Sequence, residues 1–253
     1  MFSGPYTIFA PTDKAFRALL VQLGGPDRAE QKFSQNPRLL SGLLLHHVIP
    51  GAFKIDTLQD EMTGVSLAGT QLRVNTYTTQ DAEWNDVKVV TINGARVVRE
   101  QSDIEVYQGV AHAVDRVMFP LPVGDIFQTL QADKDNRFSK FVRILDETGL
   151  SQMLTGSKTY TVFAPTDEAF PEGEVDRLLG QRGAARTLAL RHISPGTLYS
   201  AGMLYYQLRD TMTSGKQISL FKEAGRVKAN NAQVVTRNIP ATNGVIHAVN
   251  SLL

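Results

Sequence analysis

The sequence repeats itself at the length of a domain. The block Tyr6–Phe16, which reads YTIFAPTDKAF, returns as Tyr160–Phe170, which reads YTVFAPTDEAF, and the two blocks start 154 residues apart. Three shorter blocks follow in the same order in both copies: HVIPG with HISPG, NGARV with NNAQV, and GVAHAVD with GVIHAVN. This period is too long for a solenoid unit and fits a domain. We therefore expect two copies of one fold, a first domain over residues 1–122 and a second over residues 123–253.

Helix signals follow the first block of each copy. Thr12 and Thr166 stand where an N-cap residue belongs, and each hydroxyl is expected to accept a hydrogen bond from a free amide of the first turn. Asp13 and Asp167 come next, where a carboxylate favours the positive end of the helix dipole. The pattern predicts a helix beginning directly after each block.

Strand signals come mainly in the second half of each copy. Asn93-Gly94 lies between two β-branched runs and is a strong hairpin signal. The segments Val110–Val114 and Val245–Val249 alternate as half-buried strands do. Phe9 and Phe163 lie in the strand-like part of the first block and are expected to be core residues. Helices early and strands late predict an α+β fold.

Composition excludes several classes of protein. The 253 residues carry a formal net charge of +1, and no segment is strongly basic, so a nucleic-acid partner is not expected. The chain has no cysteine, which excludes disulfides and thiolate metal sites. No apolar run approaches the 18 residues of a membrane-spanning helix.

Four histidines recur in the repeated blocks and are the first candidates for chemistry. A catalytic zinc site usually needs three protein ligands, whereas each copy offers two repeated histidines and no repeated acid beside them. The alternative is that they are core groups bonded to the backbone. These histidines are His47, His112, His192 and His247.

The sequence offers no other catalytic constellation. No Gly-x-Ser-x-Gly elbow is present, and no glycine-rich loop carries the lysine of a phosphate-binding motif. We therefore predict a protein without enzymatic activity, cofactor or bound metal.

The repeated blocks resemble the fasciclin (FAS1) domain family. YT(I/V)FAPTD is similar to its first signature block, HxxPG to its central histidine motif and GVxHAV(D/N) to its second signature block. The resemblance covers nearly the whole chain. It implies a twisted β-wedge or sandwich with packed helices, and a secreted cell-adhesion or extracellular-matrix protein that binds integrins, collagen and other matrix components, or itself.

The resemblance also implies two recognition motifs. One is the central histidine, His47 or His192, although the tyrosine that precedes it in the family is replaced here by His46 and Arg191. A structural role for these histidines remains an alternative. The other motif is Asp103-Ile104, whose carboxylate could complete the oxygen shell of a receptor-bound cation. The second copy has Asn238 in place of the acid.

The two copies differ at their starts. Residues 125–157, which precede the second copy, place apolar residues at helical spacing. The first copy has no counterpart of this segment, which we interpret as a truncated first domain. We therefore expect an exposed apolar groove on the first domain, as a binding site or an aggregation liability.

Two further readings of the sequence remain open. Like copies could pair in homophilic adhesion, or the groove between helices and wedge could carry a small ligand. The segment Tyr199–Tyr206 is rich in tyrosine and is followed by Arg209, which is typical of an interface but equally compatible with a core.

Overall fold

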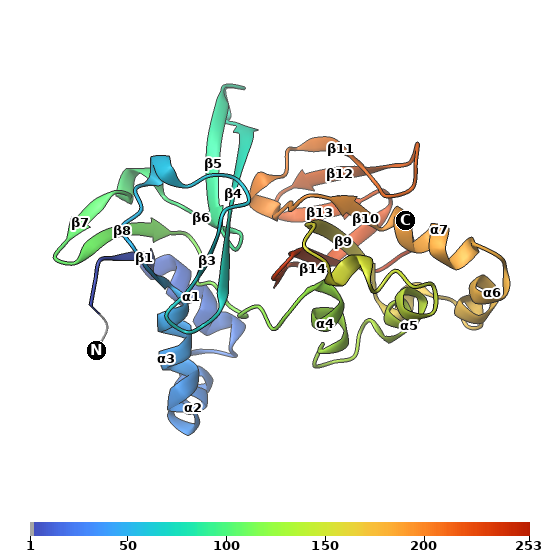
Figure 1. The fold of residues 1–253 in the computed structure, drawn as a ribbon, viewed down its shortest axis with the longest axis horizontal. Coiled ribbons are helices and arrows are strands. Elements are labelled where there is room, and N and C mark those ends of the chain that lie inside the picture. The colour runs from blue at the N-terminus through green and yellow to red at the C-terminus, as the bar shows by residue number, and fades with distance from the viewer. Residues whose placement is uncertain (1–2) are drawn as a thin grey trace. The chain divides into compact units, whose positions relative to one another are not determined.

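The computed structural model describes residues 3–253, which form two compact units divided between Leu121 and Pro122 (Figure 1). The division lies one residue before the boundary expected from the sequence. Each unit combines helices with β-strands, so the predicted α+β class is confirmed.

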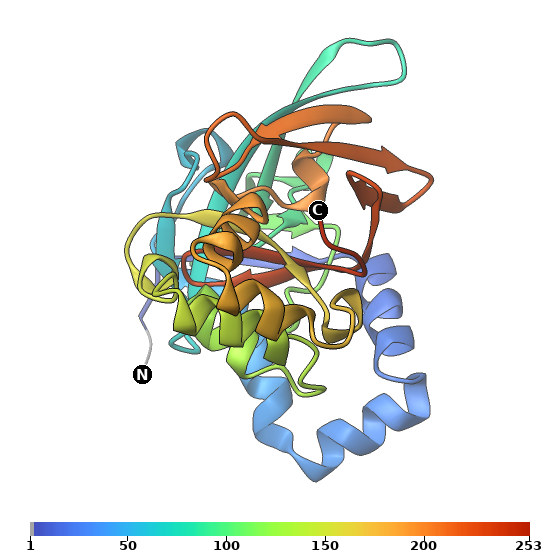
Figure 2. The ribbon, with the colours of Figure 1, turned by 90° about the vertical axis from the view of Figure 1, so that its right-hand side faces the viewer.

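The first unit contains two four-stranded sheets and three helices (Figures 1 and 2). The strand orders are β2-β1-β8-β7 and β3-β4-β5-β6. The strands are β1 (Tyr6–Pro11), β2 (Val48–Pro50), β3 (Thr63–Val65), β4 (Gln71–Gln80), β5 (Asp86–Ile92), β6 (Ala95–Arg96), β7 (Ile104–Val106) and β8 (Gly109–Val114). The helices are α1 (Asp13–Gln22), α2 (Pro26–Gln35) and α3 (Pro37–His46), with short 3-10 turns η1 (Ile55–Thr57) and η2 (Arg99–Gln101).

The second unit contains one seven-stranded sheet of order β10-β9-β15-β14-β13-β12-β11 and four helices. The strands are β9 (Tyr160–Pro165), β10 (Ile193–Pro195), β11 (Tyr206–Asp210), β12 (Gln217–Glu223), β13 (Arg226–Ala229), β14 (Ala232–Ala241) and β15 (Gly244–Val249). The helices are α4 (Ile126–Gln131), α5 (Ser139–Glu147), α6 (Glu174–Gly180) and α7 (Ala184–Arg191), with 3-10 turns η3 (Met153–Thr155), η4 (Asp167–Ala169) and η5 (Ser200–Gly202).

The first and last repeated blocks pair as parallel strands at the centre of each unit. β1 pairs with β8, and β9 pairs with β15 in the same register. Gly109 and Gly244 open the second strand of each pair with φ near 150°. A Cβ on either glycine would lie 1.8 Å from the carbonyl oxygen of Tyr6 or Tyr160. Only glycine permits this close approach, which explains why both copies have it there.

The two predicted N-caps differ. The Thr12 hydroxyl accepts a hydrogen bond from the Ala15 amide at 3.2 Å and caps α1, as predicted. The prediction for Thr166 is wrong, because its hydroxyl caps nothing and only the 3-10 turn η4 follows. Pro171 stands two residues after the end of this turn. Proline has no amide hydrogen and disfavours helical geometry in the residue before it, so the helix cannot continue.

Asp167 has a different role from its counterpart Asp13. Its Oδ1 accepts the Lys140 amide at 2.8 Å, and its Oδ2 accepts the Ser139 hydroxyl at 2.6 Å. Both donors belong to the first turn of α5, where Phe138 at the cap position offers no side-chain acceptor. Asp167 therefore caps a helix that lies earlier in the chain.

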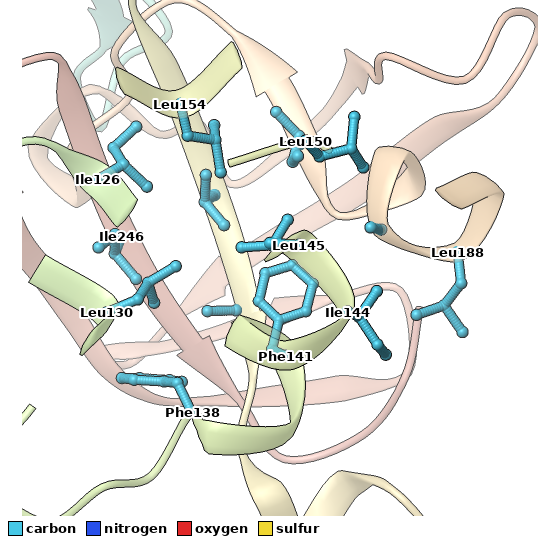
Figure 3. Close-up of a cluster of buried hydrophobic side chains, with 14 of the residues drawn as sticks. Ile126, Leu130, Phe138, Phe141, Ile144, Leu145, Leu150, Leu154, Leu188 and Ile246 are labelled. Atoms are coloured by element: carbon cyan, nitrogen blue, oxygen red, sulfur yellow. The ribbon is translucent and has the colours of Figure 1, made fainter. Parts of the chain in front are cut away.

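The core of the second unit lies between its helices and the central strands. Buried side chains of α4 and α5 gather with Ile246 of β15 and Leu188 of α7 in one cluster (Figure 3). Phe141 of α5 and Ile246 are both fully buried. The amphipathic segment 125–157 therefore covers one face of the β9–β15 pair.

The equivalent face of the first unit is open. Over the described residues, no helix covers it as α4 and α5 cover the second unit, and its apolar side chains are half-buried or exposed. We call it the bare face; it comprises Ile8, Ala10, Leu40, Leu44, Val48, Ala111 and Ala113. Their counterparts are all buried: Val162, Ala164, Ala185, Ala189, Ile193, Ile246 and Ala248. The expected exposed apolar surface on the first copy is present in this form.

Candidate recognition site

His112 on β8 anchors the loop that carries the candidate recognition residues. Its Nε2 donates to the carbonyl oxygen of Phe53 at 2.7 Å, and its Nδ1 accepts the backbone amide of Asp103 at 3.1 Å. The ring is fully buried and lies 6.0 Å, centroid to centroid, from Phe9. Both ring nitrogens are engaged by backbone groups, so the imidazole is a structural clamp.

Asp103 continues this clamp with its side chain. Its φ of 54° lies in the left-handed region, which aspartate and asparagine tolerate better than most residues. The Oδ1 atom accepts the Ile55 amide at 2.8 Å. It also lies 3.8 Å from His112 Nδ1, but that nitrogen already accepts the Asp103 amide and carries no proton to share.

The other carboxylate oxygen of Asp103 remains available to a ligand. Among the described residues none donates to Oδ2, and the side chain is 35% exposed. One oxygen therefore fixes the side chain while the other carries charge to the surface. This is the geometry expected of an acid that could complete the coordination of a cation held by another protein.

The second unit builds the same clamp without the charge. His247 Nε2 donates to the Leu198 carbonyl at 2.8 Å, and its Nδ1 accepts the Asn238 amide at 3.1 Å. The Asn238 Oδ1 accepts the Ser200 amide, and its Nδ2 donates to the Ser200 hydroxyl. Asn238 is buried and uses both ends of its amide. The loop geometry is shared, whereas the exposed carboxylate belongs to the first unit alone.

Ile104 directly follows Asp103 and is the first residue of β7, an edge strand of its sheet. It is exposed, as are Val106 and Tyr107, the latter to 98%. Sequence reasoning selected Ile104 from the family motif but missed the last two, because no repeated pattern marks them. In the second unit Ile239 takes the place of Ile104 and packs against the core cluster. The exposed apolar edge is therefore specific to the first unit.

The histidines of the central motif lie elsewhere. His47 donates through Nδ1 to the Leu43 carbonyl at 2.8 Å and accepts the Met118 amide at Nε2. His192 makes the equivalent bonds to Leu188 and to the amide of Leu253. Burial lowers the pKa of both side chains, for His192 to about 4. Neither imidazole is presented at the surface in this conformation.

His46, which stands in place of the family's tyrosine, is also buried. Its Nδ1 is hydrogen-bonded to the Thr70 hydroxyl, which in turn lies 2.6 Å from the Ser66 hydroxyl. Burial, and secondarily the neighbouring His47, lowers the pKa of His46 to about 4. The side chain therefore joins α3 to the loop after β3.

The tyrosine-rich segment after β10 divides between core and surface. Tyr199 and Met203 are buried, whereas Tyr205 and Tyr206 are exposed. Tyr206 stacks at a tilt on Phe221 of β12, with ring centroids 5.0 Å apart. The segment therefore contributes Tyr199 and Met203 to the core and presents Tyr205 and Tyr206 at the surface.

Residues 3–253 contain no group of three or more histidine, cysteine, aspartate or glutamate side chains placed to hold a metal ion. Within the same range, no helix has both the length and the apolar character needed to span a bilayer.

Comparison with known proteins relates the chain to one family. The profile of the Fasciclin domain matches residues 1–120 and again residues 136–253. The two matched segments carry the repeated blocks, and each lies within one of the two units.

Several curated proteins are similar to the chain. Transforming growth factor-beta-induced protein ig-h3 of Sus scrofa is 30% identical over 214 residues, which cover 83% of this chain and 29% of that protein. Periostin of Homo sapiens is 27% identical and Fasciclin-1 of Schistocerca americana is 27% identical, each over 99% of this chain. These alignments cover 27% of periostin and 40% of Fasciclin-1. The chain thus spans less than half the length of each relative.

A solved structure, described as a FAS1 domain pair from the insect cell adhesion molecule Fasciclin I, aligns over 98% of this chain and 88% of its own. The TM-score is 0.43 and the sequence identity is 19%.

Proposed function

This chain belongs to the fasciclin domain family, and we propose that it is a non-enzymatic extracellular adhesion or matrix-scaffold module. Support comes from its relatives, which include periostin and Fasciclin-1 and are adhesion or matrix proteins. The buried histidine clamps agree with it, because both ring nitrogens of His112 and of His247 are hydrogen-bonded to backbone groups. Secretion to the matrix or the cell surface is part of the same proposal.

The observation that carries the proposal is the carboxylate of Asp103, of which Oδ1 is hydrogen-bonded and Oδ2 is available to a ligand. Its Oδ1 accepts the Ile55 amide and its own amide donates to His112. These two bonds hold the loop and do not use Oδ2. Exposed Ile104 follows Asp103 directly in the chain, and exposed Tyr107 follows the other end of β7; they offer apolar and aromatic contact area. A metal-dependent receptor such as an integrin would take the free oxygen as a ligand of its cation and the neighbouring side chains as packing contacts.

The test is adhesion of integrin-bearing cells to the immobilised protein, with and without EDTA, comparing the wild type with Asp103→Asn. Asn238 shows that asparagine can accept the same backbone bond at the equivalent position, so the variant keeps the clamp and removes the charge. Asp115→Asn is the matched control. Asp115 accepts the Arg96 amide at 2.9 Å, and Asn250 does the same for Gln233.

We expect adhesion that EDTA abolishes, that Asp103→Asn reduces at least tenfold and that Asp115→Asn leaves intact. Equal adhesion by all three proteins would refute a role for the Asp103 carboxylate. Absence of adhesion by the folded wild type would refute direct receptor binding, and immobilised collagen would be the next partner to test.

The bare face favours a second candidate, self-association of like chains. It presents apolar side chains whose counterparts in the second unit are buried, and Leu44 of α3 is 50% exposed. Sedimentation of the wild type over a range of concentrations tests this, with Leu44→Lys as the variant expected to remain monomeric. A wild type that stays monomeric at high concentration would exclude strong pairing through this face.

A further inference from the structure

The first unit contains an apolar pocket between the edges of its two sheets. It has a volume of about 330 Å³ and lies where β2 faces β3. Phe9, Leu58 and Ile92 form its floor and are buried core residues. Val65 of β3 borders it and is exposed. The pocket therefore runs from the surface into the core.

No charged side chain lines the pocket, and Thr63 provides the one side-chain hydroxyl. Apolar surface that stays in contact with water costs free energy in proportion to its area, and an apolar ligand would remove that cost. A cavity of about 150 Å³ binds benzene, so 330 Å³ has room for a hydrocarbon of roughly twice that size. The volume also falls at the lower end of the range of small-molecule sites.

The second unit shows why the pocket is open. Gly64 on β3 and Arg209 on β11 occupy equivalent positions in the two units. Gly64 pairs with Leu72 on the next strand, and Arg209 pairs with Ile218; both partners are buried. Residues that face each other across strands share one side of a sheet. The side chain at this position therefore projects over the core side of β3 or β11.

Arg209 closes the space that Gly64 leaves open. Its Nη2 donates to the Pro195 carbonyl at 2.6 Å and its Nε to the Ser194 hydroxyl at 3.3 Å, so the guanidinium bridges the edges of β11 and β10. The hollow at this place in the second unit is lined by Arg209 and other edge residues and does not reach Phe163. In the first unit, Ile49 replaces Ser194 and is one of the lining residues.

We propose that the pocket beneath Gly64 is a binding site for an apolar small molecule or hydrocarbon tail, and that Arg209 plugs the equivalent site in the second unit. The site is distinct from Asp103 and from the bare face. It is also distinct from a groove between helices and sheet, since it lies between two sheet edges and no helix lines it.

The backbone allows a direct test. A Cβ on Gly64 would meet no atom within 4 Å, and its φ is not in the left-handed region, so Gly64→Arg adds a plug without backbone strain. Gly180 in α6 has equally open surroundings, and Gly180→Arg is the matched control. Arg209→Gly makes the reverse change and is expected to open the second site.

The measurement is a fluorescence titration with the uncharged probe N-phenyl-1-naphthylamine, with each variant first shown to be folded by circular dichroism. We expect one saturable site in the wild type, affinity at least tenfold lower in Gly64→Arg, no change in Gly180→Arg, and two sites per chain in Arg209→Gly. If Gly64→Arg fails to fold, Arg209→Gly still tests the proposal: a second site supports it, and no second site contradicts it.

Three results would overturn the proposal. The first is no saturable binding by the wild type. The second is undiminished binding by folded Gly64→Arg. The third is loss of binding in Leu44→Lys, which would place the probe on the bare face.

Discussion

The buried imidazoles of the second unit should make its stability depend on pH from about pH 6.5 downward, which begins above the range where carboxylates titrate. His192 and His247 are fully buried, and each has a pKa of about 4 in the folded protein. Desolvation is the main cause and lowers both values. The backbone bonds to Leu188 and Leu198 oppose it, and the charges of Arg191 and Arg237 add to it. In the unfolded chain each histidine should titrate near 6.5.

The direction and size of this pH effect follow from the linkage between proton binding and folding. Because the folded pKa is depressed, the unfolded state takes up protons first as the pH falls. The contribution to stability is fully present above about pH 6.5 and is progressively lost as the pH drops toward 4. At pH 5 the unfolded state of each histidine is almost fully protonated and the folded state is not, which costs about 2 kcal/mol per site. The two sites together should therefore destabilise the second unit by about 4 kcal/mol at pH 5.

Guanidinium unfolding of the whole chain between pH 7.5 and pH 5, followed by circular dichroism, measures this effect. Asp133 does not interfere. Desolvation raises its pKa, but hydrogen bonds and the charge of Arg137 together lower the pKa below 3.8, so its contribution is lost only below this range. His46 and His47 of the first unit also have lowered pKa values and add to the total slope.

His247→Gln isolates one site. Glutamine can still donate to the Leu198 carbonyl, but it does not titrate, so the slope of the unfolding free energy against pH should fall by about one proton. The variant should be less stable than the wild type at pH 7.5 and closer to it at pH 5. A stability that is flat from pH 7.5 to pH 5, or a slope unchanged in His247→Gln, would refute the reasoning.

Three further changes test the fold by denaturant unfolding. Phe163→Ala empties a fully buried aromatic site and should cost roughly 3–5 kcal/mol; a loss under about 1 kcal/mol would contradict its place in the core. Asp167→Ala removes the acceptor for the Lys140 amide and should cost about 1 kcal/mol, whereas Asp167→Asn should restore most of it; equal losses would exclude the capping role. Gly244→Ala should prevent folding of the second unit, because its Cβ would overlap the Tyr160 carbonyl; a native circular dichroism spectrum would disprove the close approach.

The sequence predicted the elements that depend on local pattern. The alternation in Val110–Val114 and the turn at Asn93-Gly94 became β8 and the β5–β6 hairpin, and Phe9 and Phe163 are buried as expected. The parallel pairing of β1 with β8 could not be predicted, because alternation marks a strand but not its neighbour. That neighbour comes about a hundred positions later in the chain.

Local signals failed where a distant contact decided the outcome. Thr166-Asp167 reads like Thr12-Asp13, yet Pro171 limits the second helix to one turn and Asp167 caps α5 instead. The hydrogen bond between Asp103 and Ile55 joins residues far apart in sequence. The sequence could therefore predict that Asp103 lies in a loop, but not that one of its carboxylate oxygens is hydrogen-bonded and the other is not. The substitution of Asn238 was a usable signal, since both side chains accept a backbone amide in the left-handed region.

The repeat also changes where function should be sought. Shared positions such as His112 with His247 are buried and bonded to the backbone, so their repetition reflects the demands of the fold. Two of the positions at which the copies differ lie at the surface of the first unit: the carboxylate of Asp103 and the opening at Gly64 have no counterpart in the second unit. A partner that reads exposed groups can therefore distinguish the copies. Binding should be specific to one unit even though the fold is common to both.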